Sequence, residues 1–327
     1  MAVMMYREAL RAALFEEMRR DPRVFVVGEE VGRYGGAYGV TKGLFEEFGA
    51  ERLVDTPISE ASTVGLGVGA AVTGLRPVVE LMYVDFVGLA MDQIANQMAK
   101  VRYMTGGQVT VPMVLRTQGG TGRSAGAQHS QSLESWLAHV PGLRVVMPAT
   151  PADAKGLLKT AIRSEDPVVF IEHKALYAMK GEVPEGEALV PFGVANIVVP
   201  GDSLTIVTYS RMLHFAVDAA KKLAEEGIHA EVIDLRTLNP LDMDTVLASV
   251  RKTRRAMVLN EAHRTAGFCA ELSARITEET FDILEAPVTR ITAKDVPVPA
   301  TLLEKLSIPG PDDICAEARS LMKRSRR

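Results

Sequence analysis

The sequence has few cysteines and no long apolar run. Cys269 and Cys315 are the only cysteines among 327 residues, and their spacing matches no metal-binding motif. Two isolated cysteines cannot form the disulfide framework of a small secreted protein, so we expect a reducing compartment. The longest uncharged apolar stretch, residues 61–75, is rich in glycine and too short to span a membrane. The sequence therefore predicts no membrane association.

The chain also lacks a strong charge of either sign. Its 37 basic and 41 acidic residues give a net charge of −4, which provides no electrostatic reason to bind nucleic acid. Walker-type loops, HExxH and GxSxG motifs are absent. Gly65, Gly67 and Gly69 do not form a dinucleotide fingerprint, because they lie inside a predicted helix and not in the turn before it.

The first residues do not resemble a targeting peptide. Three acids, Glu8, Glu16 and Glu17, lie within an amphipathic helical pattern that begins near Tyr6. Together with the cysteine usage, this pattern predicts a cytoplasmic protein or an already mature form.

The first half of the chain alternates between predicted strands and predicted helices. A hydrophobic content of 47% and a length of 327 residues favour a globular protein with two domains. Alternating strands and helices predict an α/β fold with a parallel sheet that is covered by helices on both faces. We expect strands at residues 24–27, 53–54, 78–82, 111–115, 145–147 and 168–171, and helices at 6–18, 41–48, 85–104 and 152–163.

A change of composition separates the two halves. Residues 176–192 contain Pro184, Pro191, two glycines and several glutamates, which is typical of a linker. Strands are predicted again at 204–208, 231–235, 256–259 and 288–291. We therefore expect domains at residues 1–175 and 193–327, with a frayed basic tail at 323–327.

The segment Asp55-Thr-Pro-Ile-Ser-Glu60 is the first candidate for chemistry. Pro57 ends a short strand, and Ser59 can cap the helix that follows it. Glu60 then lies at the carboxyl end of a strand, where open α/β sheets bind ligands. Among Ile58 and other apolar residues its carboxyl would be poorly solvated, which raises the pKa and suits proton exchange with a heterocyclic nitrogen. The alternative is that Glu60 only stabilises its helix through the dipole.

His129 is the second candidate, because it lies in a polar loop, residues 117–131, that follows a predicted strand. The alternative is a surface or interface histidine. Ser130 makes a nucleophilic triad conceivable, but no aspartate is placed to orient the histidine. Other candidates also have simple structural explanations: a core role for Phe86, a solvated charge for Asp92, and loop acids for Glu29 and Glu30.

Several motifs occur together in one known family. The chain resembles the beta subunits of the thiamine-diphosphate-dependent decarboxylating dehydrogenases of 2-oxo acid dehydrogenase complexes, of the pyruvate or acetoin type. The resemblance extends from about Tyr6 to Met322. It rests on Gly28-Glu-Glu-Val31, Asp55-Thr-Pro-Ile-Ser-Glu60, Gly74-Leu-Arg-Pro77, Ala127-Gln-His-Ser-Gln131, Ala154-Lys-Gly-Leu157 and Val232-Ile-Asp-Leu-Arg-Thr237.

This resemblance implies a transketolase-like pyrimidine-binding domain followed by a transketolase C-terminal domain. It assigns Glu60 to the N1′ atom of the aminopyrimidine and Phe86 to packing on that ring, with Ile58 and Met82 beside it. Glu29 is also placed among the cofactor-binding residues. The resemblance further assigns His129 to acyl transfer toward the lipoyl group and Asp92 to a proton path between two active sites.

Two ions belong to the implied chemistry. A potassium ion would be held mainly by backbone carbonyls, at Met113, Ala161, Ile162, Ser164 and Asp166. The Mg²⁺ and diphosphate ligands of thiamine enzymes are missing, because Gly201-Asp202 continues with serine and leucine and no asparagine pair follows. An alpha subunit must then hold that half of the cofactor, in an α2β2 heterotetramer.

The resemblance also implies the other partners. A dihydrolipoamide acyltransferase core would receive the acyl group, and the substrate would be a 2-oxo acid such as pyruvate. Acetoin is the alternative substrate, because residues 80–86, 171–174 and 207–209 resemble both types. Two further alternatives are a non-catalytic subunit of such a complex and a self-sufficient transketolase-like enzyme. Glu60 together with His129 argues against the first, and the missing metal motif argues against the second.

Overall fold

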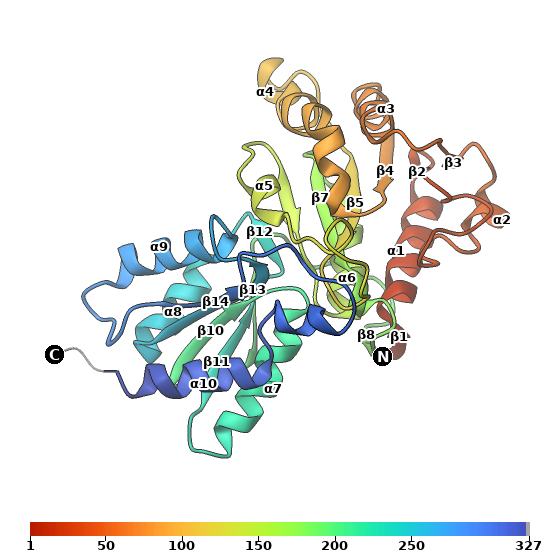
Figure 1. Cartoon of the computed structure of the whole chain (residues 1–327). Coiled ribbons are helices and arrows are strands. Elements are labelled where there is room, and N and C mark those ends of the chain that lie inside the picture. The colour runs from red at the N-terminus through yellow and green to blue at the C-terminus, as the bar shows by residue number, and fades with distance from the viewer. Residues whose placement is uncertain (325–327) are drawn as a thin grey trace. The chain divides into compact units, whose positions relative to one another are not determined.

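The computed structural model describes residues 1–324, which divide into two compact units (Figure 1). Unit 1 comprises residues 1–119 and 136–192, and unit 2 comprises residues 120–135 and the described chain from 193 onward. Most of the predicted basic tail, residues 325–327, lies outside the described residues. Among the residues described, no helix is long and apolar enough to cross a membrane.

Unit 1 alternates between strands and helical segments, as the sequence predicts. Its elements are β1 (Ala2–Met5), α1 (Tyr6–Arg20), β2 (Val24–Gly28), α2 (Leu44–Phe48), β3 (Leu53–Asp55), α3 (Glu60–Val72), β4 (Arg76–Leu81), η1 (Val84–Ala90), η2 (Gln93–Met98), α4 (Val101–Met104), β5 (Val114–Gly119), β6 (Arg144–Val146), α6 (Pro151–Arg163), β7 (Val168–His173), η3 (Lys174–Leu176) and β8 (Lys180–Val183). A short helix, α5 (Glu134–Ala138), crosses the boundary between the two units along the chain.

The main sheet of unit 1 is parallel. Its strands lie in the order β6-β7-β5-β4-β2-β3, and each neighbouring pair runs in the same direction. The strands β2, β4, β5 and β7 are buried along their whole length, because helices cover both faces of such a sheet. The predicted fold class is therefore confirmed for this half of the chain.

Helices pack against both faces of this sheet. On one face, α1 and α6 share a core with Val78 of β4 and Phe170 of β7. On the other face, α3 packs on β4, where a Cβ atom at Gly67 would overlap the side chain of Val79. Close packing of α3 on β4 therefore explains Gly67, since only a residue without a side chain allows this close approach. A Cβ at Gly69 would meet no atom within 4 Å, so close packing does not explain that glycine.

Three local predictions differ from the structure. The predicted helix at 85–104 is broken into a 3₁₀ segment, η1, a π-helical segment, η2, and the short α4. The strand β5 begins at Val114 and not at residue 111, consistent with the missing N–H group of Pro112, which cannot donate to a ladder. Ser59 does occupy the N-cap position of α3, but its hydroxyl donates to Ser62 Oγ (2.8 Å) and does not cap the helix.

The predicted linker at 176–192 is part of unit 1. It contains β8, which pairs antiparallel with β1, and Val190, whose side chain lies against Gly156 of α6. The prolines and glycines of this segment lie between packed segments, so its composition does not indicate a linker between domains here. Residues 120–135 also depart from the predicted boundaries, because they belong to unit 2.

Unit 2 is a second α/β unit with a five-stranded sheet. The strand order is β14-β13-β10-β11-β9, in which β9 alone runs antiparallel to its neighbour. Each predicted strand of this half is present, and its start lies within one residue of the prediction. The elements are β9 (Asn196–Val199), β10 (Leu204–Thr208), α7 (Met212–Ala224), β11 (Ala230–Asp234), β12 (Thr237–Asn239), α8 (Met243–Thr253), β13 (Ala256–His263), α9 (Phe268–Thr280), β14 (Thr289–Ala293), η4 (Thr301–Leu306) and α10 (Pro311–Met322).

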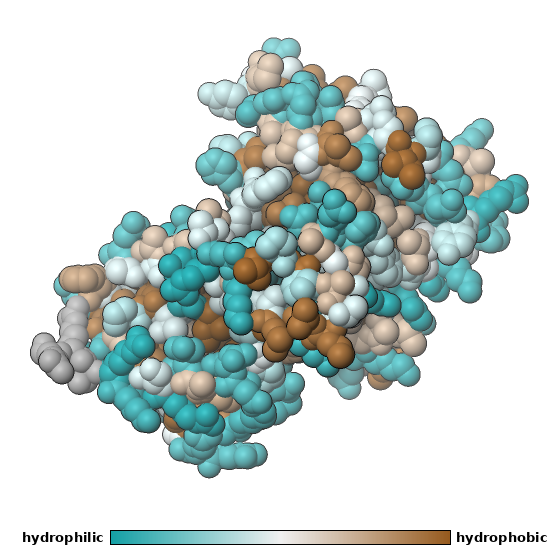
Figure 2. Space-filling model, viewed as in Figure 1, coloured by the Kyte–Doolittle hydropathy of each residue, from teal (hydrophilic) through white to brown (hydrophobic). Residues whose placement is uncertain are grey.

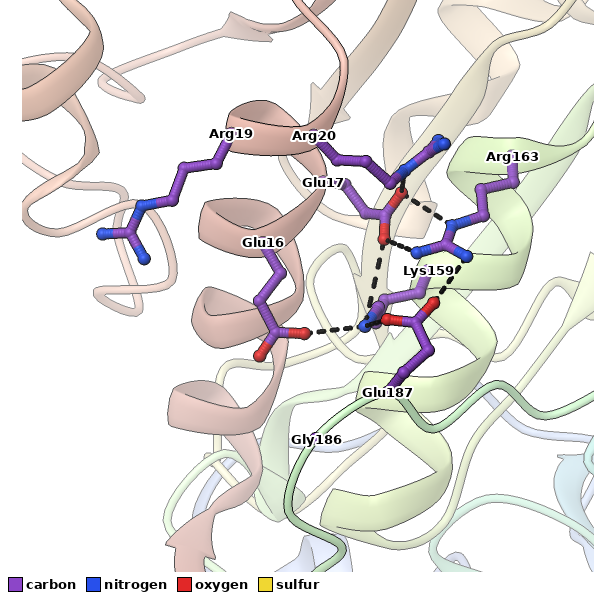
Figure 3. A pocket seen from close by; sticks show the side chains of 8 residues that line it. All are labelled: Glu16, Glu17, Arg19, Arg20, Lys159, Arg163, Gly186 and Glu187. Carbon is purple, nitrogen blue, oxygen red and sulfur yellow. Dashed lines mark hydrogen bonds and ion pairs between the residues drawn. The ribbon is translucent and has the colours of Figure 1, made fainter.

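A cluster of charged side chains joins α1 to α6 in unit 1, with Glu17 and Lys159 buried and Glu187 exposed at its rim (Figure 3). Glu17 is fully buried and pairs with Arg163 at 2.6 Å. Lys159, of which 1% is exposed, contacts Glu16 at 2.7 Å and Glu187 at 2.8 Å. The last contact fixes the turn after β8 to α6. Hydrogen bonds from Lys159 and Arg163 lower the pKa of Glu187 to about 2.

We expect the variant Glu187→Gln to be less stable than the native chain at neutral pH and equally stable in strong acid. The folded-state pKa lies below the value of about 4.3 in an unfolded chain, so the ionised carboxylate stabilises the fold above pH 5. This contribution is lost as the pH falls from about 5 toward 2. Thermal unfolding between pH 7 and pH 3.5 tests this, with Glu182→Gln as the control, since Glu182 is an exposed acid on β8. A stability difference that stays constant over this range would contradict the assignment.

Candidate active site

The carboxyl edge of the parallel sheet in unit 1 brings the predicted cofactor-binding residues together. Glu29 follows β2, Ile58 and Glu60 follow β3, and Met82 and Phe86 follow β4. These three strands are neighbours, with Gly28 at the end of β2 in register with both Asp55 and Glu80. Five residues from three separate segments therefore gather at one edge, which is where open α/β sheets bind ligands.

Glu60 is the first residue of α3 and is half-buried. A carboxyl at this position lies close to the unpaired N–H groups of the first helical turn. The expected shielding by Ile58 is wrong for the chain alone, because 78% of the Ile58 side chain is exposed. Val64, one turn further along α3, is buried. Ile58 is thus available to contact a ligand or a partner.

Glu29 is electrostatically coupled to Glu60. Burial raises the pKa of Glu29, and the negative charges of Glu60 and Glu80 raise it further. This environment favours the protonated form of the Glu29 carboxyl. From the sequence, Glu29 had the simple explanation of a loop acid, because its electrostatic interaction with Glu80 depends on the pairing of β2 with β4.

A buried ion network lies beneath this edge. The side chain of Arg116, on β5, is only 1% exposed and donates to Glu80 of β4 at 2.6 Å. It also donates to both oxygens of Glu172 on β7, at 2.7 and 2.9 Å, and Tyr177 donates to the same carboxylate at 2.6 Å. This network was not predicted from the sequence. The only sequence signal is a charged residue inside each of three strands that are otherwise suited to burial.

An aromatic and thioether surface adjoins the two carboxyls. Phe86 is half-buried, and its ring meets the ring of Tyr83 edge to face with centroids 6.1 Å apart. Gln118, at the end of β5, has its Nε2 atom 3.3 Å from the Met82 sulfur. Met82 and Phe86 therefore offer apolar surface next to carboxyls, a combination that fits a flat heterocycle with ring nitrogens.

Asp92 lies just before η2 and is exposed. Its carboxylate accepts a hydrogen bond from Asn96 at 2.7 Å. Because π-helical segments often occur at functional sites, the geometry around Asp92 is compatible with a role beyond solvation. The segments η1 and η2 also pack against α3, which begins with Glu60.

His129 lies in unit 2 and not in the unit that carries Glu60. Its ring is half-buried, and its backbone N–H donates to the carbonyl of Gly126 at 3.2 Å. The loop that carries His129 packs with residues from the second half of the chain. No sequence signal indicated this assignment, because the loop directly follows a strand of the first sheet.

The five carbonyls predicted to hold potassium all accept hydrogen bonds. The carbonyls of Ile162 and Ser164 each accept one from the Arg76 guanidinium, at 3.0 Å. The carbonyls of Met113 and Ala161 accept backbone N–H groups, and that of Asp166 accepts the Ser164 hydroxyl. A cation at this place would be repelled by Arg76. The residues as arranged therefore fit a potassium ion poorly, and the ion stays a prediction of the resemblance.

The described residues also lack a cluster suited to a divalent metal. Within residues 1–324, no group of three or more His, Cys, Asp or Glu side chains could hold a metal ion. At Gly201-Asp202, the Gly201 N–H donates to Glu231 and the Asp202 carboxylate accepts from Ser203. Cys269 and Cys315 are free and buried.

We expect Glu60→Gln to lower the pKa of Glu29 while leaving it above the ordinary value for glutamate. The substitution removes one of the two negative neighbours, but burial and the charge of Glu80 remain. A ¹³C NMR titration of glutamate carboxyls would measure this, with the Glu29 signal identified by its loss in Glu29→Gln. Glu51→Gln removes an exposed acid elsewhere and serves as the control. An unchanged Glu29 pKa in Glu60→Gln would show that the two carboxyls are not coupled.

Comparisons with known proteins agree with the predicted family. Residues 2–180 match the transketolase pyrimidine binding domain, and residues 193–314 match the transketolase C-terminal domain. The pyruvate dehydrogenase E1 component subunit beta-1, mitochondrial, of Arabidopsis thaliana is 51% identical over 99% of this chain and 90% of its own. The corresponding beta subunit of Rhizobium meliloti is 49% identical over 94% of this chain and 68% of its own.

The likeness extends to a second activity and to solved structures. The acetoin:2,6-dichlorophenolindophenol oxidoreductase subunit beta of Cupriavidus necator is 49% identical over 96% of both chains. A split-gene transketolase, solved as an inactive beta4 tetramer, superimposes with a TM-score of 0.80 at 23% identity and covers 99% of both chains. At this identity the structure shows the fold alone. The chain belongs to the transketolase-related family of thiamine-diphosphate-dependent pyruvate and acetoin dehydrogenase beta subunits.

Proposed function

We propose that this chain provides the pyrimidine half of the cofactor site in a pyruvate dehydrogenase, and that pyruvate is the substrate. The observation that supports this most is the gathering of Glu29, Glu60, Met82 and Phe86 after three neighbouring strands, at the carboxyl edge of one parallel sheet. When bound, thiamine diphosphate supplies the electron sink that decarboxylation of a 2-oxo acid requires. The residues of the protein bind and orient the cofactor and the substrate, and they exchange protons with them.

The role of Glu60 is to hold a proton at the N1′ atom of the aminopyrimidine. A carboxylic acid that donates to this nitrogen favours proton transfer elsewhere on the ring. The position of Glu60 supports this role, because it is the first residue of α3 and lies at the carboxyl edge of the sheet, where its side chain can meet a ligand. Met82 and Phe86 orient the ring through packing, and Ile58 completes the apolar surface in the assembled enzyme.

His129 assists the transfer of the acyl group to the lipoyl group of an acyltransferase core. An imidazole near neutral pH can give and take a proton in such a transfer. Asp92 is assigned to proton exchange between two active sites. We further propose that the pyrimidine-binding domain ends before residue 193, where the C-terminal domain begins. The relatives include one named mitochondrial and one from a bacterium, so the cytoplasmic location remains a prediction.

An alpha subunit completes the site and holds the diphosphate with Mg²⁺, in an α2β2 heterotetramer. The departure of Gly201-Asp202 from the family motif supports this division. So do exposed apolar residues on or near α3, η1 and α4; Figure 2 shows brown residues among teal ones in the region where Figure 1 labels α3 and α4. Such exposed apolar surface is typical of an interaction site. Its members include Ile58, Leu66, Leu89, Tyr103 and Met104, which are 47–90% exposed.

Acetoin cleavage is the second candidate function. The acetoin relative is about as similar to this chain as the pyruvate relatives are, with 49% identity against 51% and 49%. Both substrates would use the same cofactor contacts in this chain, so these contacts do not discriminate between them. A purely structural role is less consistent with the coupled carboxyls, because a packing role does not require two acids at one sheet edge.

We expect turnover only when the chain is combined with its alpha subunit, thiamine diphosphate and Mg²⁺. The reconstituted enzyme should oxidise pyruvate faster than acetoin, and the isolated chain should oxidise neither. Glu60→Gln should lower the rate by about 10² to 10⁴, because the amide cannot exchange the proton. The exposed neighbour Glu30→Gln is the matched control and should retain activity. Robust turnover by the isolated chain would overturn the half-site assignment. Faster oxidation of acetoin than of pyruvate would show that acetoin, and not pyruvate, is the substrate.

We expect His129→Ala to reduce lipoyl acylation more than decarboxylation followed with an artificial electron acceptor. The reason is that the histidine acts on acyl transfer, whereas Glu60 acts on the cofactor ring. The exposed His139 provides the matched variant, His139→Ala, which should leave both rates unchanged. Equal losses in both assays, together with weaker cofactor binding, would instead assign His129 to holding its loop in place.

A further inference from the structure

The loop that carries His129 is closed at its base and turns through several left-handed residues. The Gly120 N–H donates to the Gln131 carbonyl at 2.9 Å, which joins the two ends of the loop. Gly122, Ser124 and Gly126 adopt positive φ angles of 97°, 55° and 79°. For Ser124, this conformation requires compensating contacts, because side chains other than glycine rarely adopt it.

Those contacts come from Glu304, a residue far away in the sequence. Its carboxyl group is buried, with 6% exposed, and it lies on η4. One oxygen accepts the N–H of Gly122 at 2.9 Å, and the other accepts the N–H of Ser124 at 3.2 Å. Backbone N–H groups that flank left-handed residues converge in this way on one anion. Hydrogen bonds to an ionised carboxylate are also stronger than neutral ones.

A second buried acid holds the start of the same loop. Glu261 of β13 accepts the N–H of Thr121. Arg211 donates to the Thr121 hydroxyl at 2.9 Å and lies 3.8 Å from the Glu261 carboxylate. A cavity of about 480 Å³ borders this part of the loop, so hydrogen bonds and not close packing fix it on that side. The carboxylates of Glu261 and Glu304 therefore determine the path of the loop between residues 121 and 124.

We propose that Glu304 is a positioning residue for His129. By fixing Gly122 and Ser124, it sets the course of the loop that continues through Gly126 to the histidine, whose N–H bonds back to Gly126. The C-terminal half of the sequence thus controls the placement of an active-site side chain encoded in the first half. This inference rests on the role proposed for His129, but the hold of Glu304 on the loop can be tested separately.

Limited proteolysis of the reconstituted enzyme tests that hold without an activity measurement. The exposed Arg123 makes the bond to Ser124 a site for trypsin, and the Ser124 N–H of that bond is held by Glu304. Glu304→Gln keeps only one oxygen acceptor, and Glu304→Ala removes both. We expect cleavage after Arg123 to become about tenfold faster in Glu304→Gln and faster still in Glu304→Ala. Glu317→Gln on α10 removes an exposed acid and is the control. Unchanged cleavage in both variants, with thermal unfolding as in the native chain, would overturn the proposal.

A double-variant cycle then tests whether Glu304 acts through His129. Glu304→Gln should slow lipoyl acylation about tenfold in the native background and less than twofold in the His129→Ala background. An equal effect in both backgrounds would show that Glu304 acts on something other than His129, which overturns the positioning role. Faster cleavage combined with equal losses of acylation and decarboxylation would support the hold of Glu304 on the loop. It would overturn the proposed function of His129. If Glu304→Ala fails to fold, Glu304→Gln carries both experiments.

Discussion

The bridge from Arg116 to Glu80 and Glu172 is the constraint on which the candidate site depends. It ties the ends of β4, β5 and β7 together inside a sheet that is buried on both faces. A buried carboxylate without its partner is strongly destabilising, so the three side chains must be placed as a set. Met82 follows Glu80 by two residues, and the negative charge of Glu80 also acts on Glu29. The geometry of the candidate cofactor-binding residues therefore depends on an interaction that none of them makes.

The sequence predicted most of this fold because the relevant signals are local. The run of β-branched residues at 24–27 and the apolar periodicity at 152–163 correspond closely to β2 and α6. Predictions failed where distant contacts decide. The polar composition of 176–192 indicated a linker, but pairing of β8 with β1 makes it part of unit 1. The amphipathic pattern at 85–104 indicated one helix, and periodicity alone cannot show where a helix changes to 3₁₀ or π geometry.

The candidate site could be predicted only in part, for a similar reason. The turn at Pro57 and the helix start at Ser59 place Glu60 at a sheet edge from sequence alone, and the family resemblance supplies Met82 and Phe86. The contacts of Glu304 and Glu261 with the His129 loop join segments that are far apart in the chain. Such pairs have no signature in spacing or composition. Acids that look like ordinary surface charges in the sequence thus turn out to be buried and to fix the backbone.

The charges at the sheet edge also explain why one chain would hold only half of the cofactor. Glu80 shares the positive charge of Arg116 with Glu172, and the negative charges of Glu60 and Glu80 both act on Glu29. Burial and these neighbours raise the pKa of Glu29, so the environment favours retained protons over further anions. A neutral aminopyrimidine that accepts a hydrogen bond suits such a place. A diphosphate would be repelled there unless metal ions and basic groups neutralised it, and those groups are best supplied by a different surface.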